Sequence, residues 1–429
     1  MYARASILEL RTLLRVLMVS TEYPPMPGGV GRYTANLTES LKRIDVDMHV
    51  ASNEKGAGDF SGLSPENTQN SQVLIKIISE LQPDIVHIQF EPGLYGLILD
   101  LKDPRKSGTY IDSLYHECKV PIVTTFHTGY TLRQWLSQAS LIKKTGKTGG
   151  FGIPARASIR LWKHLLNYQA FNNLNKGKLA VSKAGIAMSN YMSKMIGRNC
   201  RVIYHGSEPA PSVSRDKNQA RKYFDLPIES HIALAAGFRT VTKGWDILPK
   251  LKLPKEWLIV TNSTRGHYNV ETIEMGWERK NKIRKRKDQE DFFHQGHYDD
   301  SDGLNIIDLE RGFLSEKELS LLFYASDVLL LPYKVTAGSG VMFDAFAHGI
   351  PFVASNLGFF QEFAAKGLGI ISKRDPDAFS KSIMKIDASY EYFTRNVDEF
   401  SQKLKWDFIA EQHAAIYYSS GVKKGIKKL

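Results

Sequence analysis

A repeated order of short apolar runs, glycine-rich loops and amphipathic stretches constrains the fold of this 429-residue chain most strongly. In its clearest copy, residues 327–349 (DVLLLPYKVTAGSGVMFDAFAHG), an apolar run ends at Pro332 and apolar residues then recur at helical spacing, which predicts strand, loop and helix. Gly338, Ser339 and Gly340 directly precede the helix, where unpaired backbone amides and the helix dipole favour an anion. The loop therefore predicts a phosphate site, and a plain flexible turn is the alternative.

The same order recurs from the N-terminus. Residues 15–20 predict a buried strand, and a loop rich in Pro and Gly that contains Gly28 and Gly29 leads into a helix. His127 directly follows another predicted strand, and ligands of open α/β sheets bind beyond the carboxyl ends of strands, so His127 is a candidate site residue or else a merely hydrogen-bonded histidine. The predicted strands of this half are residues 15–20, 47–52, 84–88, 121–126, 178–182 and 201–206, with helices to about residue 43, near 73–81 and over 183–196.

A change of composition at residues 207–219, rich in Pro, Ser and charge, predicts a linker between two domains. The second domain begins with a predicted strand at residues 231–238, and Arg239 and Lys243 follow it. A unit charge about 4 Å from a phosphate oxygen contributes roughly 4 kcal/mol at an effective dielectric constant near 20, so two such cations would hold a diphosphate. Two solvated loop charges are the alternative. Further strands are predicted at residues 256–261, 327–331 and 351–355, and helices at 314–326 and 402–418.

The formal net charge of +12 favours anionic partners but does not choose among them. Cys118 and Cys200 stand alone in the sequence, which predicts neither a disulfide framework nor a zinc site and indicates a reducing, cytoplasmic compartment. No apolar run reaches the ~18 residues of a membrane span. Glu9 and Arg11 interrupt the leader, so no signal peptide is predicted.

Two basic segments suggest different partners. In residues 143–163, three lysines precede a glycine-rich turn, and Arg156, Arg160 and Lys163 then fall on one stripe of a predicted helix. This basic segment would lie on an anionic membrane surface at its inner face, or its charges are simply solvated. The basic run at residues 279–287 would suit nucleic acid, but no nucleic-acid-binding motif accompanies it, so a solvated insertion and no nucleic-acid partner are expected. Asp45 and Asp47 form a D-x-D pattern at the wrong end of the sheet for a ligand, so we expect no metal site.

Taken in order, these motifs resemble the GT-B glycosyltransferases, in particular the large retaining family that includes phosphatidylinositol mannosyltransferases and sucrose synthases. The resemblance covers residues 15–418 and rests on PPMPGGVGRY, PDIVHIQFEPGLYG, PIVTTFHTGY, residues 237–244, and LSEKELSLLFYASDVLLLPYK followed by SGVMFDAFAHGIPFVAS. It implies an α/β protein of two Rossmann-like, doubly wound parallel-sheet domains that face each other across a cleft. The predicted parts are an extension at 1–14, an acceptor-side domain at 15–208, a linker at 209–222, a donor-binding domain at 223–400, a helix crossing back at 401–420 and a basic tail at 421–429.

The resemblance also implies roles for the candidate residues. Arg239 and Lys243 would bind the diphosphate of a UDP- or GDP-type sugar, and the backbone of Gly338, Ser339 and Gly340 would assist. Asp344 would accept hydrogen bonds from the ribose hydroxyls. The loop with Gly28 and Gly29 would approach the donor from the other domain, and His127 would lie near the transferred sugar and the acceptor.

One position departs from the family pattern. The family has two glutamates eight positions apart, and here Thr336 and Asp344 stand in those places, so Thr336 offers the sugar a neutral hydroxyl. The implied activity is retaining, metal-independent transfer of a hexose, without a cofactor, to a glycan or lipid-linked acceptor in polysaccharide or glycoconjugate synthesis. The alternative is a catalytically silent GT-B protein that binds a nucleotide sugar or a protein partner.

Overall fold

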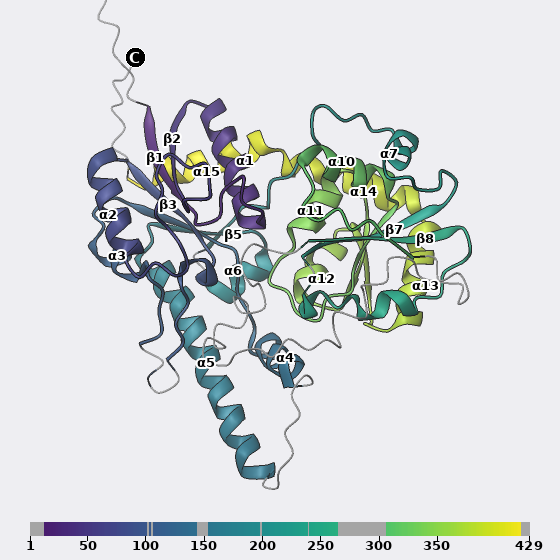
Figure 1. Ribbon diagram of the computed structural model, residues 1–429, viewed down its shortest axis with the longest axis horizontal. Coiled ribbons are helices and arrows are strands. Elements are labelled where there is room, and N and C mark those ends of the chain that lie inside the picture. Colours follow the sequence, from purple (N-terminus) through teal and green to yellow (C-terminus); the bar gives the residue numbers. More distant parts are fainter. Residues whose placement is uncertain are drawn as a thin grey trace, which may run out of the picture.

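The protein forms two lobes that lie side by side, each built on a six-stranded parallel sheet with helices on its faces (Figure 1). The computed structural model describes residues 13–100, 103, 106–143, 153–197, 200–238, 240–264 and 306–421. The predicted fold class, GT-B with two Rossmann-like domains, is confirmed.

The first domain contains a sheet in the order β2-β1-β3-β4-β5-β6. Every residue of β3 and β4 is buried, as expected for parallel strands that are covered by helices on both faces. The strands are β1 (Leu14–Val19), β2 (Val46–Ala51), β3 (Ile85–Phe90), β4 (Ile122–Phe126), β5 (Ala184–Ala187) and β6 (Cys200–Val202), and the helices are α1 (Gly29–Arg43), α2 (Asn70–Leu81), η1 (Pro92–Tyr95), α3 (Asp112–Glu117), α4 (Leu132–Lys143), α5 (Ile153–Val181) and α6 (Asn190–Ile196).

The second domain also contains a six-stranded parallel sheet, but its strand order, β12-β11-β10-β7-β8-β9, differs from that of the first domain. Its chain order reverses between β7 and β10, and the crevice beyond such a switch point is where open α/β sheets bind ligands. The strands are β7 (His231–Phe238), β8 (Trp257–Thr264), β9 (Ile306–Asp308), β10 (Val328–Leu331), β11 (Phe352–Ser355) and β12 (Gly369–Ser372), and the helices are α7 (Lys217–Tyr223), η3 (Val241–Lys243), η4 (Trp245–Lys250), α10 (Glu316–Ala325), α11 (Gly340–Ala347), α12 (Gly358–Ala364), α13 (Pro376–Asp387) and α14 (Tyr390–Ser401).

The last helix returns to the first domain. After η6 (Gln402–Leu404), α15 (Trp406–Ser419) packs beside α1, where the yellow and purple ribbons meet in Figure 1. The Tyr33 hydroxyl lies 3.3 Å from His413 Nε2, and the Tyr417 hydroxyl lies 2.6 Å from His87 Nδ1. These buried polar contacts fix α15 on the core of the first domain.

One predicted strand is wrong. Residues 178–181 form the last turn of α5, and the strand that follows is β5, which lies within the helix predicted at 183–196. A short apolar run does not distinguish strand from helix, and here the helix continues through Lys178, whose Nζ pairs with Asp112 Oδ1 of α3 at 2.5 Å. The β5 residues Ala184, Gly185 and Ala187 have low strand propensity, and only their place between β4 and β6 makes them a strand.

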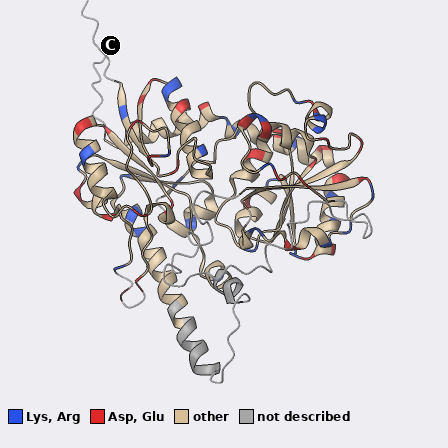
Figure 2. Ribbon diagram, viewed as in Figure 1, with Lys and Arg blue, Asp and Glu red and all other residues tan. Residues whose placement is uncertain are grey.

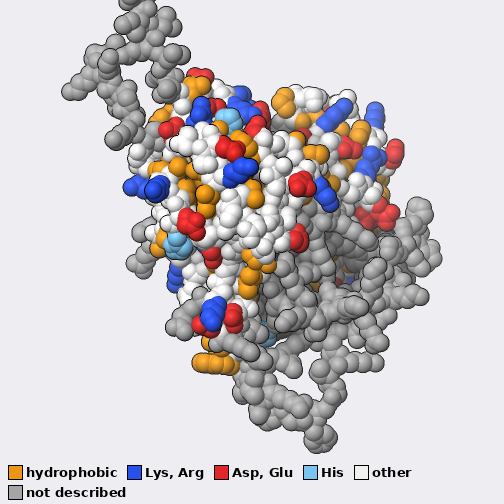
Figure 3. All heavy atoms as spheres, turned by 60° about the vertical axis from the view of Figure 1, so that its left-hand side comes forward, with side chains coloured by type: hydrophobic (Ala, Val, Ile, Leu, Met, Phe, Trp, Pro, Cys, Tyr) orange, Lys and Arg blue, Asp and Glu red, His pale blue; other side chains and the backbone are white. Residues whose placement is uncertain are grey.

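Charges of both signs are interspersed over the two domains (Figure 2) and on the described face in Figure 3. The net positive charge is therefore not gathered into one patch on that face. The basic run at 279–287 lies outside the described residues, and so do the side chains of most of the predicted membrane-facing segment, 143–163. Among the described residues, no helix combines the length and apolar character that a bilayer span requires.

Candidate functional site

The loop between β10 and α11 is folded by the side chain of Thr336. Its hydroxyl donates to the Gly338 carbonyl at 2.5 Å and accepts from the Gly338 N–H at 3.2 Å. Thr336 is only 7% exposed, so in this conformation its hydroxyl stabilises the turn that precedes α11. Ser339, the residue before the helix, lies with its Oγ 3.3 Å from the Tyr333 hydroxyl.

Lys243 lies against the same loop. Its Nζ is 4.0 Å from the centroid of the Tyr333 ring, within the range of a cation–π contact. Gly244 has a left-handed φ of +67°, and a Cβ there would lie 2.1 Å from the Pro332 carbonyl oxygen, so only glycine lets this loop pack so closely on the end of β10. Lys243 and the 338–340 loop are thus brought together, whereas Arg239 lies outside the described residues.

In the first domain, the carboxyl group of Glu22 lies against the predicted glycine loop. Glu22 Oε2 accepts hydrogen bonds from the backbone N–H groups of Val30 and Gly31, both at 3.2 Å, in the first turn of α1. A Cβ on Gly28 would lie 2.2 Å from Glu22 Oε2, whereas one on Gly29 would meet no atom within 4 Å. Burial raises the pKa of Glu22 to about 7, although the two amides oppose that shift. Gly28 therefore makes room for Glu22 at the helix N-terminus.

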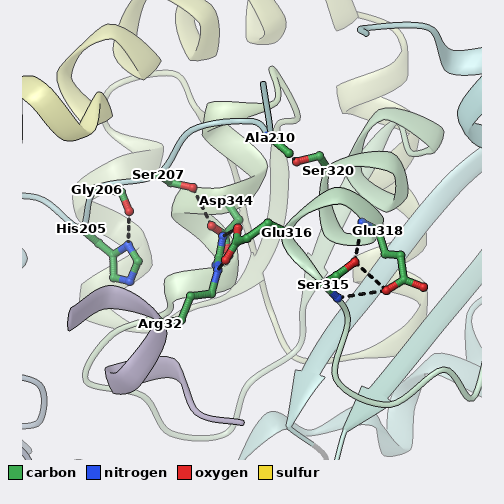
Figure 4. A network of polar contacts seen from close by, with 10 residues as sticks. All are labelled: Arg32, His205, Gly206, Ser207, Ala210, Ser315, Glu316, Glu318, Ser320 and Asp344. Atoms are coloured by element: carbon green, nitrogen blue, oxygen red, sulfur yellow. Dashed lines mark hydrogen bonds and ion pairs between the residues drawn. The ribbon is translucent and has the colours of Figure 1, made fainter. Parts of the chain in front are cut away.

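An ion-pair network joins the two domains where Asp344 lies (Figure 4). Arg32 of α1 donates to Asp344 Oδ2 of α11 at 2.8 Å and to both carboxylate oxygens of Glu316 at the start of α10. The Ser207 hydroxyl donates to Asp344 Oδ1 at 2.6 Å. Burial by itself would raise the pKa of Asp344, but Arg32 and these hydrogen bonds outweigh it and lower the pKa below its usual value. Both carboxylate oxygens of Asp344, the residue predicted to contact the ribose, therefore accept hydrogen bonds from protein groups.

His127 connects to the same region through aromatic contacts. Its Nε2 lies 2.8 Å from Gln89 Oε1, and its ring packs edge-on to Tyr33 with a centroid distance of 5.4 Å. Tyr33 in turn contacts His205 at 5.0 Å, and a Cβ on Gly340 would lie 3.3 Å from His205 Nε2. Burial lowers the pKa of His127 to about 3 and that of His205 to about 4, so both imidazoles are neutral near pH 7.

Several residues at the domain interface were missed in the sequence. Glu362 of α12 accepts hydrogen bonds from the N–H groups of Asn190 and Tyr191 at the start of α6. Gln134 of α4 donates to the Thr336 carbonyl at 2.6 Å. These two side chains belong to no motif that the sequence shows, and only their partners in the other domain give them a role.

Comparisons with known proteins agree with this architecture. The chain has the fold of HepE of Anabaena in complex with UDP and glucose, with 13% identity and a TM-score of 0.59 over 95% of this chain and 100% of that one. It is similar to sucrose-phosphate synthase of Thermosynechococcus elongatus, with 15% identity and a TM-score of 0.58 over 94% of this chain and 98% of that one. A glycosyltransferase of Rickettsia africae has the same fold, with 14% identity and a TM-score of 0.60 over 96% of this chain and 100% of that one. Residues 27–210 match the sequence model of the family described as Glycosyltransferase Family 4. The resemblance that the motifs indicated is thereby confirmed. No curated protein sequence matches the chain.

Proposed function

We propose that the chain is a retaining glycosyltransferase that moves a hexose from a UDP- or GDP-type sugar to a glycan or lipid-linked acceptor, without a metal or other cofactor. The single observation that carries this proposal is the meeting of Lys243, Tyr333 and Ser339 at the carboxyl ends of β7 and β10. A fixed cation beside the N-terminus of a helix stabilises a departing diphosphate, because it opposes negative charge as that charge develops. The family model matched by residues 27–210 and the UDP held by HepE support the same substrate class.

In this reaction the remaining candidates have complementary tasks. Arg239 would share the diphosphate with Lys243, and the neutral His127 would accept or donate a hydrogen bond at the transferred sugar. Domain closure through α1 and α11 would align the acceptor with the anomeric carbon and expel water.

The test is a comparison of Lys243→Ala with Lys250→Ala, a matched exposed lysine on the neighbouring η4. With a panel of nucleotide sugars, turnover followed by mass spectrometry should fall at least about 100-fold in Lys243→Ala, which corresponds to roughly 3 kcal/mol. Lys250→Ala should retain full activity. Equal activity of the two variants would remove Lys243 from the reaction. NMR of the product anomer tests retention, and incubation with a chelator tests metal independence.

A second candidate function is that of a catalytically silent protein that binds a nucleotide sugar or a partner. Two observations favour it. Thr336 and Asp344, which stand in the places of the usual glutamate pair, form hydrogen bonds to protein groups, Thr336 with Gly338 and Asp344 with Arg32. This candidate predicts that UDP or GDP raises the unfolding temperature while no donor is turned over. Any turnover that depends on Lys243 excludes it.

We further propose a cytoplasmic location, peripheral at the inner face of the membrane, with a role in polysaccharide or glycoconjugate synthesis. The basic composition of residues 143–163 supports the membrane contact. Sedimentation with anionic liposomes at low salt tests it, and a chain that stays in the supernatant would contradict it.

A further inference from the structure

A cavity lies at the carboxyl edge of the second sheet, next to the residues assigned to the donor, and Tyr333 belongs to both. It has a volume of about 440 Å³ and is lined by the segments that follow β10, β11 and β12, and by Arg133 of α4 from the first domain. The described residues that line it do not include Lys243 or the 338–340 loop. Its volume falls within the range of small-molecule sites, so it would hold more than a single ion.

The cavity wall is strongly basic. Arg133, Lys334, Lys373 and Arg374 all line it, and Asp246 is the carboxylate beside them. Asp246 Oδ1 accepts from Lys334 Nζ at 2.9 Å and from Arg374 Nη2 at 2.5 Å. Asp246 thereby holds both cations in place. Arg374 is fixed further, because its Nε donates to the Pro332 carbonyl at 2.8 Å.

The other two cations are available. Arg133 and Lys373 are exposed, and neither forms an ion pair with a residue in the described part of the chain. Among the described residues, Asp246 pairs with two of the four cations that line the cavity, and the excess positive charge attracts an anion.

A buried hydroxyl in the same wall also lacks a partner. Ser355, at the end of β11, is 3% exposed, and its Oγ has no hydrogen-bond partner among the described residues. A buried hydroxyl without a partner costs free energy, so a native structure usually satisfies it with protein, water or ligand. An anionic oxygen in the cavity would accept from it.

We propose that this cavity binds a phosphoryl group carried by the acceptor. The proposal rests on the proposed transferase function and adds the chemical class of the acceptor to it. The four cations and the free hydroxyl match a phosphoryl oxygen, and the remaining volume accommodates the sugar or headgroup attached to it. Because Arg133 comes from the first domain and the other residues from the second, the site is complete only when the domains are together.

The experiment measures the affinity of inorganic phosphate by ³¹P NMR titration at constant ionic strength. The variant is Arg133→Gln/Lys373→Gln, and the matched control, Lys250→Gln/Lys381→Gln, removes the same charge from exposed sites of the second domain. The Kd for phosphate should rise at least about tenfold in the variant and stay within about twofold of wild type in the control. An unchanged Kd in the variant would overturn the proposal.

Ser355→Ala provides a second measure. Without phosphate, its unfolding temperature should equal or exceed that of wild type, because the lost hydroxyl has no partner, whereas phosphate binding should weaken about threefold or more. Unweakened binding would exclude Ser355 from the site.

Affinity for UDP and GDP, measured on the same variants, separates this site from the donor site. Nucleotide affinity should not change in Arg133→Gln/Lys373→Gln, and a parallel loss would assign the cavity to the donor diphosphate and overturn the proposal. Glucose 1-phosphate in solution and phosphatidylinositol vesicles then distinguish a soluble from a lipid source, each compared between wild type and variant. If no nucleotide binds at all, the proposed function fails while the phosphate titration still reports on the cavity.

Discussion

Replacing Arg32 with Met would leave a buried carboxylate without its cation. Asp344 has a side chain only 4% exposed, and after the change only Ser207 would still donate to it. Removing one partner of a buried pair costs about 3–5 kcal/mol, and we expect about 3 kcal/mol because the Arg32 side chain is itself 20% exposed. Glu316 is 48% exposed, so Glu316→Gln, the control, should cost no more than about 1 kcal/mol.

The loss should depend on pH in a defined direction. Arg32 is the main group that holds the pKa of Asp344 down against burial, so in Arg32→Met that pKa rises above its unfolded value. A raised folded-state pKa contributes stability at low pH and loses it as pH increases, so the variant should be least stable relative to wild type near pH 8. Urea unfolding at pH 5 and pH 8 measures this difference, and Arg32→Met/Asp344→Asn should recover most of the loss. If Arg32→Met unfolds like Glu316→Gln at both pH values, the ion pair contributes little and the reasoning is refuted.

Two further predictions concern Glu22 and the packing glycines. The pKa of Glu22 is raised from 4.5 to about 7, so its charge should cost stability as pH rises through that interval. The free energy of unfolding of Glu22→Gln should equal that of wild type near pH 4 and exceed it by about 3 kcal/mol near pH 8. Exposed Glu54→Gln is the control, and a difference that does not depend on pH would contradict this prediction. A Cβ on Gly206 would lie 2.4 Å from the Trp406 ring, so Gly206→Ala should destabilise by about 1–3 kcal/mol. By contrast, Gly177 lies in α5, and a Cβ there would meet no atom within 4 Å, so Gly177→Ala should stabilise the protein by about 0.5–1 kcal/mol. Equal melting temperatures of the Gly206→Ala and Gly177→Ala variants would argue against the close packing of α15.

Local pattern predicted much of the fold. Most strands and helices lie where apolar runs and helical spacing placed them, for example β7 at His231–Phe238 and α11 beginning at Gly340. The error at residues 178–182 arose because a short apolar run suits both a strand and the end of a long helix. The end of α5 makes a tertiary contact, the ion pair of Lys178 with Asp112, that links residues 66 positions apart and that no local pattern shows.

The candidate site was predicted only in part. The glycine loop and Lys243 were predicted to share a site because glycines and cations at the carboxyl ends of strands carry a local signal, and in the fold they lie together around Tyr333. What Thr336 and Asp344 contact in this conformation was not foreseeable, since their partners depend on turn geometry and on the approach of α1.

The sequence by itself determined most of the alternation of strands and helices and predicted the edge of each sheet at which a ligand would bind. These properties follow from side-chain periodicity and glycine content within short segments. The tertiary structure alone decided which groups meet. Arg32 and Asp344 are 312 positions apart, Glu22 occupies amides that a phosphate would otherwise use, and Arg133 and Lys373 line one cavity from two domains. Electrostatic pairing and desolvation depend on distances between segments, and only folding sets those distances.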